Sequence, residues 1–162
     1  MLSSVPENRV ERRHMGRMRP AQGVYVLSGH PTIVFLTVCT KDRNPWLADA
    51  TVHQSLQAAW QSAQAWLVGY YLLMHDHLHL FCAPKDLNFT LEQWVVFWKL
   101  EFRRLHNAPQ CRWQSHFFDY RLRRQESYSE KWSYVRENPL RKGLVQKAEA
   151  WPYQGMMNVL LW

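Results

Sequence analysis

The sequence predicts a single α+β domain in which helices pack on an antiparallel sheet. Segments rich in β-branched and aromatic residues alternate along the chain with segments whose apolar residues recur at helical spacing. The chain has 162 residues, of which 47% are hydrophobic, and this is enough for one hydrophobic core. No internal repeat or low-complexity linker divides it. We expect about four strands and three helices.

The predicted domain occupies residues 31–150, between a basic N-terminal arm at residues 1–30 and a C-terminal tail at residues 151–162 that docks on the domain. The arm has few large apolar residues and carries Arg9, Arg12, Arg13, Arg17 and Arg19. Such a segment either binds a phosphate backbone or is a solvated terminus.

The composition is basic, with 20 Lys and Arg against 13 Asp and Glu and a net charge of +7. This balance indicates a polyanionic partner, most simply nucleic acid, although a basic protein without such a ligand has the same composition. Three widely separated cysteines predict neither a disulfide framework nor a zinc knuckle. The sequence shows no apolar run long enough to span a membrane and no signal peptide, so we expect a cytoplasmic, nucleoid-associated protein that does not bind membranes.

The first predicted strand is "TIVFLTVCT" at residues 32–40, which ends in the turn-like "KDRNP". A helix follows in "DATVHQSLQAAWQSAQAW", with Asp49 as its N-cap. Its apolar residues are spaced for one helix face and comprise Val52, Leu56, Ala59, Trp60 and Ala63.

Next comes "YYLLMHDHLHLF", residues 70–81, which contains three histidines. We interpret this region as two strands, at about residues 66–74 and 77–83, that meet at a tight "MHDH" turn. Side chains at i and i+2 of a strand share a face, so His77 and His79 project together and Leu78 points into the core. Two neutral imidazoles form half of a divalent-metal site, or they are polar residues on a solvated strand face. His75 is a turn residue, with Asp76 as its polar neighbour.

A second amphipathic helix is predicted at residues 90–106, where Thr90 is the N-cap and Gln93 closes a capping box. Its predicted apolar stripe consists of Leu91, Trp94, Val95, Trp98, Phe102 and Leu105.

A strand at about residues 115–122 precedes a third helix, "ESYSEKWSYVRE", which should end near Asn138 because Pro139 disfavours helical geometry in the preceding residue. Tyr134 and Asn138 are four residues apart and can reach one site. A tyrosine hydroxyl can attack a phosphodiester that a metal polarises, and an amide oxygen is a suitable ligand for Mg²⁺ or Mn²⁺. Alternatively, Tyr134 is a packed aromatic residue and Asn138 is a helix C-cap.

In these segments the sequence resembles the HUH single-tyrosine transposases, and within them the REP-associated tyrosine transposases. The segment "MHDHLHLF" is similar to the family's Met-Pro-(Asn/Asp)-His-hydrophobic-His-Leu signature, and "FFDYRLR" to the segment before its catalytic helix. The block "ESYSEKWSYVRENPLRKGLV" resembles the family's Tyr-(Ile/Val)-x-x-Asn-Pro block. With "TKDRNPWLA" and "WPYQG" these matches run in family order over residues 32–155. One departure is His75, where the family usually has proline.

The resemblance implies a ferredoxin-like fold of the HUH endonuclease type that cleaves single-stranded or hairpin DNA. In that reading Tyr134 is the catalytic nucleophile and forms a 5′-phosphotyrosine link, while His77, His79 and Asn138 hold Mg²⁺ or Mn²⁺. A strand-transfer step then reverses the attack with another 3′-hydroxyl. The implied substrate is a REP-type hairpin, and the protein acts as a monomer or a homodimer. Tyr128 is the competing nucleophile, but it lies nearly on the opposite helix face from Tyr134.

Clusters of cations lie beside aromatic residues, a combination suited to binding phosphates and stacking unpaired bases, although solvated faces have the same composition. The predicted DNA-binding residues are Arg12, Arg13, Arg17, Lys99, Arg103, Arg104, Arg121, Arg123, Arg124, Arg136, Arg141 and Lys142. Two other functions fit the same sequence: a domesticated protein that binds hairpin DNA without cleavage, and an RNA-binding or RNA-processing protein.

Overall fold

The computed structural model describes residues 32–122 and 127–161. The predicted basic arm, with Arg12, Arg13 and Arg17, and the pair Arg123 and Arg124 lie outside this part of the chain. The elements in chain order are β1 (Val34–Thr40), η1 (Lys41–Arg43), α1 (Ala50–Ser62), β2 (Trp66–Leu73), β3 (His77–Pro84), α2 (Leu91–His106), β4 (Trp113–Arg121), α3 (Tyr128–Arg136), α4 (Asn138–Arg141), η2 (Ala148–Ala150) and β5 (Gln154–Met156).

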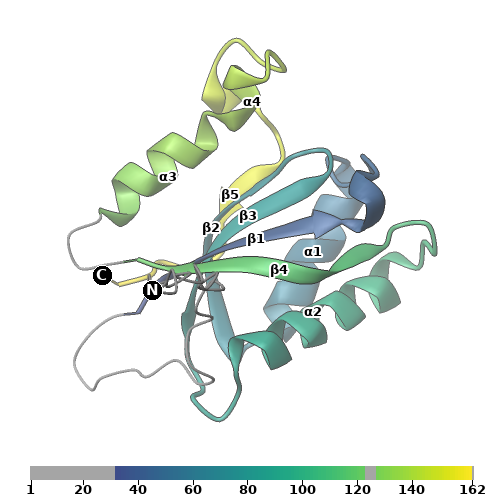
Figure 1. Cartoon of the computed structure of the whole chain (residues 1–162), viewed down its shortest axis with the longest axis vertical. Coiled ribbons are helices and arrows are strands. Elements are labelled where there is room, and N and C mark those ends of the chain that lie inside the picture. The colour runs from purple at the N-terminus through teal and green to yellow at the C-terminus, as the bar shows by residue number, and fades with distance from the viewer. Residues whose placement is uncertain (1–31, 123–126, 162) are drawn as a thin grey trace, which may run out of the picture.

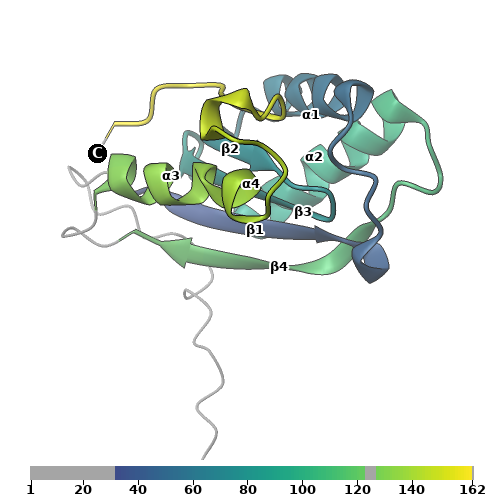
Figure 2. The same cartoon turned by 90° about the horizontal axis from the view of Figure 1, so that it is seen from above.

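The strands form one sheet in the order β4-β1-β3-β2-β5, and every neighbouring pair is antiparallel. With α1 between β1 and β2 and α2 between β3 and β4, the first four strands have the ferredoxin-like arrangement. The helices α1 and α2 cover one face of the sheet, and α3 and α4 lie over the other (Figures 1 and 2). The predicted α+β class and the ferredoxin-like fold are therefore confirmed.

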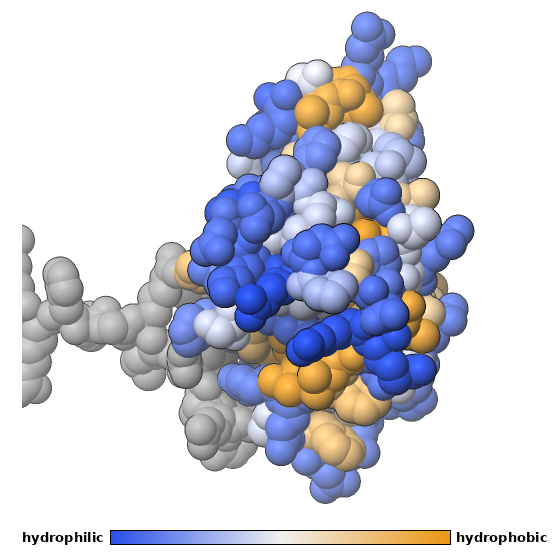
Figure 3. Space-filling model, turned by 90° about the vertical axis from the view of Figure 1, so that its right-hand side faces the viewer, coloured by the Kyte–Doolittle hydropathy of each residue, from blue (hydrophilic) through white to orange (hydrophobic). Residues whose placement is uncertain are grey.

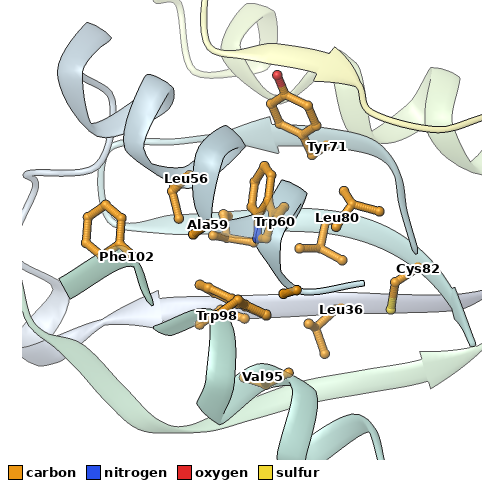
Figure 4. Close-up of a cluster of buried hydrophobic side chains, with 14 of the residues drawn as sticks. Leu36, Leu56, Ala59, Trp60, Tyr71, Leu80, Cys82, Val95, Trp98 and Phe102 are labelled. Atoms are coloured by element: carbon orange, nitrogen blue, oxygen red, sulfur yellow. The ribbon is translucent and has the colours of Figure 1, made fainter. Parts of the chain in front are cut away.

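The larger hydrophobic core lies between the sheet and the pair α1 and α2 (Figure 4). Leu78, Leu80 and Cys82 of β3 all point into it and are fully buried. Tryptophans from both helices pack edge to face in this core, with the ring centroids of Trp60 and Trp98 6.1 Å apart. Because the side chains of β3 alternate, its other residues must face α3 and α4.

Both predicted helix starts are confirmed. The Asp49 carboxylate accepts hydrogen bonds from the backbone N–H groups of Thr51 and Val52 at the start of α1. Thr90 and Gln93 form a complete capping box at the start of α2. The predicted stripe of α2 is wrong at one position, because Leu105 is 40% exposed whereas the other five residues are buried. Leu105 lies in the last turn of the helix.

The second core joins α3 to the opposite face of the sheet. The ring of Trp132 stacks on Tyr70 at 4.7 Å, and Tyr128 packs edge to face on Phe81 at 4.9 Å. The Tyr128 hydroxyl also accepts a 3.0 Å hydrogen bond from the backbone N–H of Tyr70. Since Phe81 belongs to β3, α3 is attached to the central strand that carries His77 and His79.

The third helix ends close to Asn138, as predicted, but a further short helix follows it. The helix α3 ends at Arg136, and the proline lies in the first turn of a separate short helix, α4. Proline is tolerated there because the backbone N–H groups of a first helical turn have no intrahelical partner. Asn138 is therefore the first residue of α4 and not the C-cap of α3, whose C-cap is Glu137.

A fifth strand was not predicted. The segment β5 pairs with β2 through Tyr71 and Gly155, and the indole N–H of Trp151 donates to the Leu73 carbonyl oxygen at 2.7 Å. Three residues are too few for a recognisable alternating pattern, so the pairing depends on contacts with β2 that the sequence does not reveal. No helix in the described part of the chain is long and apolar enough to cross a membrane.

Gly69 provides a test of how α3 is attached. A Cβ atom at this position would collide with the Tyr128 hydroxyl oxygen and would lie 2.6 Å from Cδ1 of Leu160. We expect Gly69→Ala to lower the free energy of unfolding by about 1–3 kcal/mol, because the added methyl group overpacks the contact. Urea unfolding measures this change. Gln54→Ala on the exposed side of α1 is the control, and an equal stability of the two variants would contradict the prediction.

Candidate active site

His77 and His79 lie next to each other on the face of β3 that α3 covers. Their ring centroids are 4.8 Å apart. His79 also stacks on Phe35 of the neighbouring strand β1, with the centroids 5.2 Å apart. Phe81 follows on the same face and contacts Tyr128 of α3. The alternation of β3 therefore places the two imidazoles beside the surface on which α3 is docked.

Asp76 orients the ring of His77. Its Oδ1 is 2.7 Å from Nδ1 of His77, and its Oδ2 accepts a 2.9 Å hydrogen bond from Nε of Arg43. Burial raises the pKa of the Asp76 carboxyl, but the hydrogen bond to His77 and the charges of His77 and Arg43 outweigh this effect and lower it below its usual value. A carboxylate that accepts the Nδ1 proton leaves Nε2 as the lone-pair nitrogen of a neutral imidazole.

Thr37 has the same relation to His79. The Thr37 hydroxyl lies 2.8 Å from Nδ1 of His79. As in His77, the hydrogen-bonded nitrogen is Nδ1 and not Nε2. Burial, with smaller contributions from the charges of His77 and Arg43, lowers the pKa of His79 to about 3. His79 is consequently neutral at physiological pH, the protonation state that a metal ligand requires.

The turn after β1 holds Arg43 in place. Asp42 and Arg43 both adopt left-handed backbone conformations, with φ of 54° and 58°. This turn is attached to the β2–β3 turn, because the Thr40 N–H donates to the Asp76 carbonyl oxygen and the Leu47 N–H donates to the His75 carbonyl oxygen, both at 2.9 Å. The contact between Arg43 and Asp76 thus depends on two turns that are far apart in the sequence.

Tyr134 is exposed and Asn138 lies close to it. The ring of Tyr134 is 65% exposed, and the guanidinium carbon of Arg141 is 4.3 Å from its centroid. Nη2 of the same arginine donates to Oδ1 of Asn138, and its Nη1 is 3.6 Å from the Glu137 carboxylate. Although the helix is interrupted at Glu137, Arg141 therefore connects the two predicted site residues.

Tyr128 is in a different environment from Tyr134. It packs in the second core and its hydroxyl is bound to the Tyr70 backbone. Burial raises its pKa to about 12. A buried hydroxyl whose ionisation is suppressed is a poor nucleophile, so Tyr134 is the better placed of the two tyrosines.

The two groups of site residues share a sheet face but are not bonded to each other. In residues 32–122 and 127–161, no hydrogen bond or ring contact joins Tyr134 or Asn138 to either imidazole. That part of the chain also holds no cluster of three or more His, Cys, Asp or Glu side chains suited to a metal ion. The protein side chains thus offer two imidazole nitrogens for a metal, and the amide oxygen of Asn138 is occupied by Arg141.

Three of the predicted DNA-binding residues, Lys99, Arg103 and Arg104, belong to α2, on the opposite side of the sheet from the histidines. The Lys99 amine donates to the Gln114 carbonyl oxygen at 3.0 Å, and burial lowers its pKa to about 8. Arg104 pairs with Glu101 on the same helix. Hydrophobic and hydrophilic side chains are mixed on this side of the molecule (Figure 3).

The remaining predicted cations lie near β4 and α4. Arg121 ends β4 and donates to the Thr32 hydroxyl at 3.2 Å. Arg136 forms a 2.8 Å ion pair with Glu149, while Lys142 is exposed after α4. Arg121, Arg141 and Lys142 are exposed, whereas Arg136 is half-buried.

Sequence reasoning missed the partners of the histidines. Asp76 was interpreted as a polar neighbour in a turn, yet it orients His77. Thr37 and Arg43 were not singled out, because each lies more than 30 residues from its partner in the sequence. The adjacency of Asp76 and His77 was the one local signal that could have suggested this contact.

Three features describe this structure: an antiparallel ferredoxin-like sheet, a histidine pair on its central strand, and a tyrosine-bearing helix on the same face. They are the features to compare with solved structures. The chain is similar to the solved structure of a REP-associated tyrosine transposase bound to a REP hairpin, with a TM-score of 0.67 and 19% identity over 86% of this chain and 82% of that one. It also aligns with a crystal structure of a "putative transposase" from Deinococcus radiodurans R1, with a TM-score of 0.48 and 15% identity over 73% of this chain and 95% of that one.

No protein-family model matches the chain. No curated protein sequence matches it either. The chain shares the fold of the solved REP-associated tyrosine transposase, so the resemblance that the sequence motifs predicted is confirmed at the level of the fold.

The environment of Tyr128 gives a testable expectation. Tyr128→Phe removes the hydroxyl that accepts the Tyr70 N–H and leaves this partly buried donor without its partner. We expect the free energy of unfolding to fall by about 1–3 kcal/mol. Chemical denaturation measures the difference, with Tyr134→Phe as the matched control, because the exposed Tyr134 should contribute little to stability. Equal destabilisation by both changes would contradict the assignment of Tyr128 to the core.

Proposed function

We propose that this protein is a metal-dependent single-strand DNA endonuclease and strand transferase of the HUH tyrosine class, acting on REP-type hairpins. The observation that carries the proposal is the orientation of the histidine pair. Asp76 and Thr37 each engage an Nδ1 atom, which leaves both Nε2 atoms available on the sheet face that α3 covers. The REP hairpin bound to the similar solved structure supports DNA of this kind as the substrate.

The residues present fit a divalent metal ion. His77 and His79 would hold it through their Nε2 atoms, and the Asn138 amide could contribute an oxygen once Arg141 releases it. We expect Mn²⁺ to bind more tightly than Mg²⁺, because two of these ligands are imidazoles. A bound metal supplies Lewis-acid stabilisation of the charge that develops on the phosphate.

Tyr134 would act as the nucleophile. Its hydroxyl oxygen forms a bond to phosphorus while the bond from phosphorus to the 3′ oxygen breaks, giving a 5′-phosphotyrosine and a 3′-hydroxyl. The phenolic proton passes to solvent, and the leaving oxygen takes up a proton from solvent. Arg141, whose guanidinium lies beside the Tyr134 ring, would bind the phosphate oxygens. Attack by another 3′-hydroxyl reverses the link, so the strand transfer needs no nucleotide energy source.

A second candidate is a protein that binds hairpin DNA without cleaving it. The observation that favours it is the pairing of Asn138 with Arg141, which leaves two rather than three side-chain ligands. Incubation of the full chain with Mn²⁺ and hairpin DNA distinguishes the two functions, since only the endonuclease releases a cleaved strand.

The nucleophile can be tested directly. We expect Tyr134→Phe to abolish the covalent protein–DNA adduct, because phenylalanine has no oxygen to attack phosphorus, while binding of the hairpin stays largely intact. Denaturing gel electrophoresis of labelled DNA reports the adduct, and fluorescence anisotropy reports the binding. Tyr128→Phe is the matched control and should still form the adduct. A Tyr134→Phe protein that forms the adduct at the normal rate would refute the assignment.

The role of Asp76 can be tested without turnover. We expect Asp76→Ala to weaken Mn²⁺ binding to the DNA-free protein by about 10- to 100-fold, because the ring of His77 loses the group that orients it. Isothermal titration calorimetry or the electron paramagnetic resonance signal of free Mn²⁺ measures this affinity. Asp86→Ala, which removes a carboxylate in the loop after β3, should leave it unchanged. Wild-type affinity in Asp76→Ala would rule out the orienting role.

A further inference from the structure

The edge strand β4 presents an aromatic surface beside the histidine pair. Side chains alternate along β4, so Phe117 packs against the core under α1 and α2 while Phe118 and Tyr120 point to the other face. Phe118 is 57% exposed and Tyr120 is 37% exposed. Exposed aromatic area of this kind is typical of surfaces that bind a ligand.

The register of the sheet places Phe118 close to His79. Thr37 of β1 is paired with Phe118 on one side and with His79 on the other. Neighbouring strands lie about 4.8 Å apart, so the Cα atoms of Phe118 and His79 are separated by about 10 Å. The same Thr37 hydroxyl contacts Nδ1 of His79. A nucleotide on Phe118 would therefore belong to the same short piece of strand as a phosphate near the histidines.

A lysine of α3 lies beside this surface. The Lys131 amine of α3 lies 5.3 Å from the ring centroid of Tyr120 and 5.8 Å from that of Phe35. Arg121 is next in sequence to Tyr120 and pairs with Val34, so it follows the alternation to the other face of the sheet and Lys131 is the cation beside the rings. Positive charge beside exposed aromatic rings is the combination that binds single-stranded nucleic acid, with the cations on phosphates and the rings on bases. A second copy of this chain would bring like charges together and is disfavoured.

We propose that Phe118, assisted by Tyr120 and Lys131, forms a stacking platform for an unpaired base of single-stranded DNA next to the cleavage position. The inference rests on the proposed function, since it specifies how the unpaired strand beside a hairpin is held. A flat aromatic ring stacks on any base, so the platform positions the strand without reading its sequence. Recognition of the DNA sequence would depend on contacts elsewhere on the protein.

Binding assays in EDTA test the platform apart from cleavage. The probes are a hairpin with an unpaired 5′ flank and the same hairpin without it, each followed by fluorescence anisotropy. We expect Phe118→Ala to weaken binding of the flanked hairpin by about 5- to 150-fold, the loss expected for one stacked base. Binding of the unflanked hairpin should not change. Phe118→Trp should restore the affinity, because the larger ring also stacks.

The matched control is Phe97→Ala, which removes another exposed phenylalanine, on α2 at the opposite face of the sheet. It should affect neither probe. A 2-aminopurine base placed at successive flank positions should be quenched at one of them in the wild type and in Phe97→Ala, and should recover its fluorescence in Phe118→Ala.

Three results would overturn the platform: unchanged binding of the flanked hairpin by Phe118→Ala, an equal loss for both probes, or tighter binding of the matching RNA flank than of DNA. These results are separable from a failure of the proposed function. Loss of flank binding in Phe118→Ala with no adduct in the wild type would keep the platform and refute the endonuclease. Normal adduct formation in the wild type with no effect of Phe118→Ala on flank binding would keep the endonuclease and refute the platform.

Discussion

The central strand β3 has helices packed on both of its faces, and the rest of the structure depends on how its side chains alternate between them. One set of side chains, Leu78, Leu80 and Cys82, fills the core under α1 and α2. The other set, His77, His79 and Phe81, faces α3. A shift of the register by one residue would bury the imidazoles among tryptophans and expose the leucines. The hydrophobic core therefore fixes the direction of the histidines with the same contacts that stabilise the sheet.

The ends of the strands add a second constraint. Two successive left-handed residues, Asp42 and Arg43, cost on the order of 1–2 kcal/mol each, because their side chains crowd the backbone in this conformation. The turn is retained by backbone hydrogen bonds from Thr40 to Asp76 and from Leu47 to His75. It brings a guanidinium group to the carboxylate that holds His77. Unfavourable backbone geometry that is kept next to a candidate site is a reason to regard the Arg43–Asp76–His77 chain as functional.

The family resemblance predicted the ferredoxin-like fold, whereas the residue patterns themselves predicted local features. The caps at Asp49 and Thr90, the alternation around Leu78 and the helix that carries Tyr134 all depend on residues a few positions apart, and these predictions agree with the structure. The contacts that sequence reasoning missed join distant segments. Arg43 meets Asp76 across 33 residues and Thr37 meets His79 across 42. They depend on which side chains the order β4-β1-β3-β2 brings together, and no local pattern encodes these pairs.

The same distinction explains the two tyrosines of α3. Both lie on one short helix, and periodicity alone shows that they face different directions without showing which one faces the core. Gly69 determines which tyrosine faces the core, because its lack of a side chain lets the Tyr128 hydroxyl approach the backbone of β2. Docking through Tyr128 and Trp132 leaves Tyr134 at the exposed side of the helix, beside Arg141.

This arrangement separates the hydrogen-bonded half of the candidate site from its solvent-exposed half. The imidazoles are fixed on the central strand of the sheet, where Asp76 and Thr37 hold both rings. Tyr134 is attached to the sheet only through its helix and remains open to solvent. In the proposed function that difference matters, because the tyrosine has to carry a covalently linked DNA end and later release it to another strand. An exposed side chain on a docked helix can do so without disturbing either hydrophobic core.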